Sequence, residues 1–202
     1  MILWKVVILP RRVVLMRISI KGFQDYKHIC MALEASHIRF AIDVADYLQV
    51  KDRGAYVSGT IYPDSRYITK VDRVLTHPKL DTVRAFLQGS EFAKGWFVHL
   101  WCDKIQWRLT KEIFPEIVSG ETGPGKSNWV YHTALKILQD IDDVQHPEVW
   151  QMVSRLRSVE YPNYENPEKI NEYNQLFPVL FAAPDTLVVR DYEFLFQSFS
   201  LG

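Results

Sequence analysis

The sequence predicts an all-α fold, built as a single multi-helix domain. Apolar residues recur at helical spacings of three and four from Met31 to the C-terminal region. The composition, 48% hydrophobic and 24% charged, is that of an ordinary globular protein, and no repeat or low-complexity tract interrupts it. A chain of 202 residues is also long enough for one good-sized core.

The first thirty residues differ from this helical pattern. Their alternating apolar and basic residues are typical of an edge strand, and a non-native extension explains them equally well because Met31 begins a more orderly pattern. We therefore predict an N-terminal extension over residues 1–30 and one all-α domain over residues 31–202.

No membrane-spanning segment or secretory signal is expected. The opening apolar run is broken at residues 10–12 by a proline and two arginines, and no convincing cleavage site follows it. The two cysteines, Cys30 and Cys102, are too few for a disulfide framework or a thiolate zinc cluster. These features predict a reducing, cytoplasmic location.

The first firm helix is expected over residues 33–48, where apolar residues and His37 share one face. Gly59 and Pro63 interrupt the pattern, so residues 59–68 are predicted to form a turn. A short helix then ends at Gly89.

A long amphipathic helix is predicted over residues 91–114, where Pro115 ends it. The later elements, in order, are a loop over 116–128, helices over 129–144, 147–159 and 166–183, and a stretch over 185–199 that is ambiguous between strand and helix. Pro178 is expected to kink or end the last of the three helices.

Residues 120–127, "GETGPGKS", match the pattern of a nucleotide-binding P-loop. A P-loop needs a buried strand before the glycines and a helix after the Lys-Ser pair, within a parallel sheet. The helix is predicted here, but the segment before the motif is a long aromatic helix. We favour an interhelical loop in which Ser127 or Asn128 caps the following helix.

Histidine and aspartate residues suggest a metal site instead. His99 and Asp103 are four residues apart, so on a helix both side chains project from one face. His37, Asp64 and His77 also lie in apolar surroundings, where ionisable groups are costly unless they are paired or bind a metal. Nitrogen and oxygen ligands without thiolates suit Zn²⁺, with Mn²⁺ or Fe²⁺ as alternatives.

Four stretches, "SHIRFAIDVADYL", "GTIYPDSRY", "LTH" and "GWFVHLWCD", resemble in order and spacing the zinc-dependent phospholipase C family, which also includes relatives of the S1/P1 nucleases. The resemblance covers about residues 34–145. It implies an all-α fold that holds one to three metal ions and cleaves phosphate esters.

The resemblance also implies roles for individual residues. The implied ligands of the first metal are Asp64, His77, His99 and Asp103. Asp103 would bridge to a second metal that also takes His37, and His132 would bind a third. The chain departs from the family because no N-terminal residue is available to complete the second site, and because Lys136 stands where a glutamate ligand is expected; Asp140 or Asp143 could replace that glutamate.

The predicted function is therefore metal-dependent hydrolysis of a small-molecule phosphoester, either a diester or a monoester, by metal-activated water. Asp64 and Asp103 are the expected catalytic residues, and Arg66 and Arg73 the expected substrate-binding residues. A net charge of zero gives no reason to expect a nucleic-acid partner. The alternatives are a non-catalytic helical protein with a structural metal and a nucleotide binder that uses residues 120–127.

Overall fold

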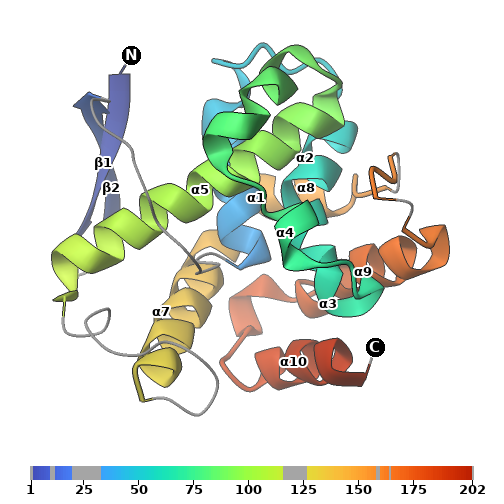
Figure 1. Cartoon of the computed structure of the whole chain (residues 1–202). Coiled ribbons are helices and arrows are strands. Elements are labelled where there is room, and N and C mark those ends of the chain that lie inside the picture. The colour runs from blue at the N-terminus through green and yellow to red at the C-terminus, as the bar shows by residue number, and fades with distance from the viewer. Residues whose placement is uncertain are drawn as a thin grey trace.

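The computed structural model describes residues 2–9, 12–19, 33–115, 127–157, 160–163 and 165–201. From residue 33 onward every regular element in these ranges is helical, which confirms the all-α prediction (Figure 1). The α-helices are α1 (Glu34–Ala45), α2 (Arg53–Ile61), α3 (Arg66–Thr69), α4 (Arg73–Thr76), α5 (Glu91–Ile113), α7 (Ser127–Val144), α8 (Pro147–Val153), α9 (Pro167–Leu180) and α10 (Asp191–Leu201). The 3-10 helices are η1 (Tyr62–Ser65), η2 (Leu80–Gln88) and η3 (Pro184–Thr186).

The N-terminal segment forms the strands β1 (Ile2–Leu9) and β2 (Arg12–Ser19). They pair with each other in antiparallel register, with Val6 opposite Leu15. The alternating pattern of this segment thus gives strands, as expected, and the helical domain begins after them.

Residues 59–68 are helical, so the predicted turn is wrong. Gly59 lies within α2, and Pro63 is in the first turn of η1, where the missing N–H of a proline costs no helical hydrogen bond. The chain continues directly into α3, which ends at Lys70 with a left-handed backbone, φ 61°.

Gly59 belongs in a helix because α2 and α5 approach each other closely. A Cβ atom at Gly59 would lie 2.0 Å from the carbonyl oxygen of Phe92 in α5. On the other helix, a Cβ atom at Gly95 of α5 would lie 1.9 Å from the carbonyl oxygen of Tyr56 in α2. The two glycines therefore allow the two helices to touch backbone to backbone, and sequence pattern alone does not reveal such a contact.

The remaining predicted helices are present with changed ends. The segment before Gly89 is a 3-10 helix, and α8 is shorter than expected because it ends at Val153. Helix α9 continues past Pro178 to Leu180. The ambiguous C-terminal stretch becomes η3 and α10 and contributes no strand.

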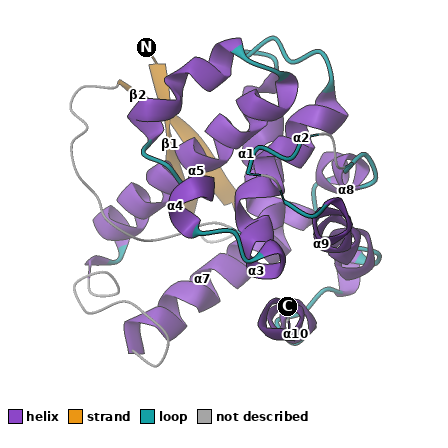
Figure 2. Cartoon of the chain, turned by 45° about the vertical axis from the view of Figure 1, so that its right-hand side comes forward, coloured by secondary structure: helices purple, strands orange, loops and turns teal. Residues whose placement is uncertain are grey.

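Helix α1 lies at the centre of the domain and packs against α2, α5, α7 and α8, whereas α9 and α10 pack against α3 (Figure 2). The large fully buried side chains that fill the core include Tyr56, Tyr173, Tyr192, Phe177 and Ile38. Cys102 is buried and unpaired. None of the helices in the described part of the chain has the length and apolarity needed to cross a bilayer.

Candidate metal centre

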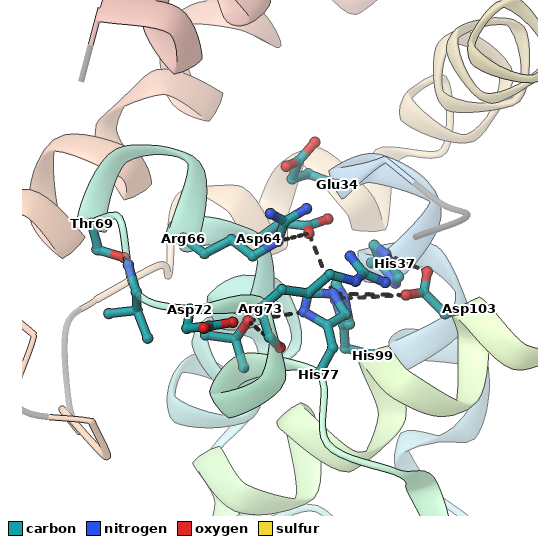
Figure 3. Close-up of polar contacts among 12 residues, drawn as sticks. Glu34, His37, Asp64, Arg66, Thr69, Asp72, Arg73, His77, His99 and Asp103 are labelled. Carbon is teal, nitrogen blue, oxygen red and sulfur yellow. Dashed lines mark hydrogen bonds and ion pairs between the residues drawn. The ribbon is translucent and has the colours of Figure 1, made fainter. Parts of the chain in front are cut away.

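Four segments that are distant in the sequence bring five ionisable side chains together (Figure 3). Helix α1 supplies His37, η1 supplies Asp64, the residue after α4 is His77, and α5 supplies both His99 and Asp103. None of the five side chains is more than 9% exposed. The structure thus assembles the ligand residues that the sequence predicts for the first metal, with His37 beside them.

The orientation of His99 is fixed by the backbone of α2. Its Nδ1 lies 2.8 Å from the carbonyl oxygen of Thr60, which can only accept a hydrogen bond, so Nδ1 carries the proton. Burial, reinforced by the neighbouring His37, lowers the pKa of His99 to about 3. The ring is therefore neutral near pH 7, and its Nε2 presents a lone pair to the centre.

The orientation of His77 is fixed by its neighbour Thr76. The Thr76 hydroxyl lies 3.4 Å from the carbonyl oxygen of Arg73, to which it donates, and 2.9 Å from Nδ1 of His77, from which it accepts. The Nε2 atom of His77 is thereby directed at Nε2 of His99, 3.2 Å away. Two lone pairs this close require a cation between them, either a proton or a metal ion.

Two carboxylates complete this group. Asp64 Oδ1 lies 3.5 Å from Nε2 of His77, and Asp103 Oδ2 lies 3.7 Å from Nε2 of His99. Burial by itself would raise the pKa of Asp64, but its contact with His77 and the other nearby imidazoles hold it well below its usual range. Asp64 is therefore ionised and can act as a ligand.

The spacing of these atoms suits a metal ion. Ligand atoms about 2.0–2.1 Å from a tetrahedral Zn²⁺ are separated from one another by about 3.3 Å. Atoms of His77, His99 and Asp103 all lie within 4.8 Å of one another, and so do atoms of His37, Asp64 and His99. The buried histidines and aspartates could hold a metal ion after small side-chain adjustments.

His37 adds a second set of contacts. Its Nε2 lies 3.5 Å from Oδ1 of Asp103, while the other oxygen of that carboxylate faces His77 and His99. Its ring stacks on that of His99, with 3.8 Å between centroids. Burial lowers the pKa of His37. Neither of its ring nitrogens has a hydrogen-bond partner among the described residues, so its Nε2 could bind a metal ion.

His132 lies apart from these five residues. It is buried beside Trp107, with 6.2 Å between ring centroids, and belongs to neither ligand group found in the described ranges. Burial, together with the charge of Lys136, lowers the pKa of His132 to about 4. Its role as the ligand of a third metal stays a prediction.

The two predicted substrate-binding arginines flank the centre (Figure 3). Arg66 Nε lies 4.0 Å from Oδ1 of Asp64, and its guanidinium group stacks over the Tyr67 ring at 4.1 Å. That Nε is buried and has no hydrogen-bond partner within the described chain. Arg73 extends from α4 over His77.

A second buried polar group lies between α1, α7, α9 and α10, and it includes the two aspartates considered as substitutes for the missing glutamate ligand. We call Glu34, Asp140 and Asp143 the acidic cluster. Tyr173 donates to Glu34 Oε1 at 2.7 Å, and Tyr192 donates to Asp140 Oδ2 at 2.8 Å.

Burial raises the pKa of Glu34 to about 8, that of Asp140 to about 7 and that of Asp143 to about 6. Asp140 also accepts a hydrogen bond from the backbone N–H of Ser36 at 2.8 Å. Neither Asp140 nor Asp143 joins His132 in a ligand group among the described residues. Glu34 could have been noticed in the sequence, because it precedes His37 by three residues on the buried face of α1.

The P-loop match falls largely outside the described residues. Of residues 120–127 only Ser127 is described, as the first residue of α7, with Asn128 in the same turn. The C-terminal stretch over 185–199, for which a strand is one of two expectations, runs through η3 into α10 instead. The described elements thus lend the nucleotide-binding alternative no support.

No family model, curated protein or solved structure matches this chain, so the case for the metal centre depends on its own geometry.

Proposed function

We propose that the protein is a metal-dependent hydrolase of phosphate esters. The observation that carries this proposal is the pair of imidazole Nε2 atoms, 3.2 Å apart, with Asp64 and Asp103 beside them. Thr60 and Thr76 each occupy the Nδ1 side of one ring, as is usual for histidines that bind a metal through Nε2. The proposed first site therefore consists of His77, His99, Asp64 and Asp103.

Zn²⁺ is the proposed ion, and Mn²⁺ or Fe²⁺ would also accept this mixture of nitrogen and oxygen ligands. When bound, such an ion lowers the pKa of water and stabilises charge on phosphoryl oxygens. Asp103 presents its other oxygen to His37, so these two residues would hold a second ion. Two ions side by side are the common arrangement for displacement at phosphorus.

The protein's own residues would orient the substrate. Arg66 brings a guanidinium group beside Asp64, with one N–H donor unused by the described residues. The rigid fork of an arginine matches the oxygens of a phosphate. Arg66 and Arg73 would thus hold the phosphoryl group over the centre, and the ionised Asp64 would accept a proton from a water molecule beside it.

The test is hydrolysis of bis(p-nitrophenyl) phosphate and p-nitrophenyl phosphate by protein loaded with zinc or manganese. We expect turnover by the wild type, and a loss of at least about 100-fold in Asp103→Asn. Asp143→Asn is the matched control, because it makes the same chemical change in a buried carboxylate outside the centre. Equal rates in wild type and Asp103→Asn would refute the proposal.

A structural metal is the second candidate, and the burial of the ligands favours it. His37 and His99 are 0% exposed and Asp64 is 2% exposed, as in a site closed to substrate. In that case the protein would bind the ion and gain stability from it, but neither phosphoester would be hydrolysed. Metal binding without turnover would therefore select this candidate.

A further inference from the structure

A basic pocket lies at the N-terminal end of α2, whereas the metal centre lies beyond its C-terminal end. The pocket has a volume of about 600 Å³, and its lining residues are Lys51, Asp52, Arg53, Gly54, Arg155 and Arg157. A helix of nine residues spans about 13 Å, so one small ligand could not touch both places. The basic pocket is therefore separate from the proposed active site.

Positive charge in the basic pocket exceeds negative charge. Arg157 forms an ion pair with Asp52, and Arg53 forms one with Asp46 at 2.8 Å. Lys51 and Arg155 are both exposed and have no ion-pair partner in the described part of the chain. Two positive charges without an ion-pair partner among the described residues thus line a shared hollow, an arrangement that an anion would stabilise.

The two segments that line the pocket are fixed to each other. The backbone N–H of Arg157 donates to the Ser58 hydroxyl of α2 at 2.8 Å. A Cβ atom at Gly54 would lie 3.1 Å from the Arg155 carbonyl oxygen and 3.6 Å from Nε of Arg157, so the missing side chain keeps the floor of the pocket open. Asp52 is held by Arg157 and by the N–H of Ala55, which leaves Lys51 and Arg155 available to a ligand.

We propose that the basic pocket binds a small phosphorylated molecule through Lys51 and Arg155. A phosphate monoester carries close to two negative charges at neutral pH, which matches the two uncompensated cations. An arginine can donate two parallel hydrogen bonds to such a group, and a lysine adds a point charge. The ligand contacts residues 51–54 and 155–157 and leaves the metal ligands untouched.

The test is a titration of ¹⁵N-labelled full-length protein with inorganic phosphate at constant ionic strength, followed by amide NMR. We expect a saturable shift of the Gly54 amide, equal in wild type and in the metal-centre variant Asp103→Asn. In Lys51→Ala/Arg155→Ala the dissociation constant should rise at least tenfold. Arg190→Ala, which removes an exposed arginine elsewhere, is the matched control and should bind like wild type.

The single variants Lys51→Gln and Arg155→Gln, each expected to weaken binding, replace the double variant if its amide spectrum shows loss of folding. Three outcomes would overturn the proposal. Shifts could saturate only around Thr76 and vanish in Asp103→Asn, which would assign phosphate to the metal centre alone. Shifts could grow linearly and equally with chloride, which would indicate general screening. The third such outcome is an unchanged affinity for phosphate both when Lys51 is replaced and when Arg155 is replaced.

Discussion

Two buried polar clusters of the domain, the metal centre and the acidic cluster, differ in chemical character. In the metal centre, His77 and His99 direct nitrogen lone pairs at each other, beside the carboxylates of Asp64 and Asp103. In the acidic cluster, tyrosine hydroxyls donate to Glu34 and to Asp140. Both clusters contain carboxylates in the interior of the same domain, but these carboxylates face imidazoles in the metal centre and tyrosine hydroxyls in the acidic cluster.

The difference shows how a protein can keep ionisable groups in its interior by two routes. Burial raises the pKa values of the acidic cluster, so Glu34 retains its proton near pH 7 and Asp140 is partly protonated, and both accept hydrogen bonds from tyrosine hydroxyls. In the metal centre, by contrast, the pKa of Asp103 is lowered, because the effect of burial is exceeded by that of the nearby imidazoles. The acidic cluster is stabilised by protons and tyrosine donors, whereas the metal centre could hold a metal ion.

The largest expected effect is on metal content. Asp103→Asn should weaken zinc affinity at least about 100-fold, because this carboxylate faces both proposed sites, whereas Asp143→Asn should leave affinity unchanged. Elemental mass spectrometry after dialysis against buffered zinc measures the difference. Equal metal content in the two variants would mean that the metal centre does not bind zinc in preference to the acidic cluster.

The second-largest expected effect is a loss of stability when the metal is removed. Zinc at about 100 times its dissociation constant adds about 2.7 kcal/mol to the free energy of unfolding, or roughly 5–10 °C in Tm for a chain of this size. Calorimetry with and without chelator measures this shift. The Tm of Asp103→Asn is expected to be the same with and without chelator. A wild-type Tm that does not change with chelator would contradict the proposed centre.

Thr76→Val should have a smaller effect on zinc affinity, about tenfold, because it removes the acceptor that orients His77 while preserving shape. Thr82→Val is a suitable control, since that threonine is exposed and contacts only the backbone. Competition with a chromogenic chelator gives both affinities. If the two variants bind zinc alike, Thr76 does not orient a ligand.

The smallest expected effect concerns the acidic cluster. The pKa of Glu34 is raised from 4.5 to about 8 in the folded protein, so its contribution to stability is fully present below about pH 4.5 and is lost as the pH rises through 8. Relative to Glu34→Gln, the metal-free wild type should therefore lose at least about 1 kcal/mol between these pH values. Urea denaturation at several pH values measures the difference; parallel curves would mean that Glu34 is ionised in the fold.

Much of the helical fold, and the His99–Asp103 pair of the candidate metal centre, could be predicted from the sequence, because both depend on local spacing. The period of apolar residues indicates α1, α5 and α7, and the four-residue separation of His99 and Asp103 places them on one helix face. The acidic cluster could not be predicted in this way. Tyr173 is 139 residues from Glu34, and Tyr192 is 52 residues from Asp140, so only the tertiary fold reveals these donors.

The close contact between α2 and α5 has a consequence for the interpretation of mutational scans. Gly59 and Gly95 bring the two backbones together, and α2 carries the Thr60 carbonyl that orients His99 of α5. An alanine at either position would push the helices apart and misalign the ligand. Saturation mutagenesis would thus rank two residues without side chains among the least tolerant, although neither of them participates in the chemistry.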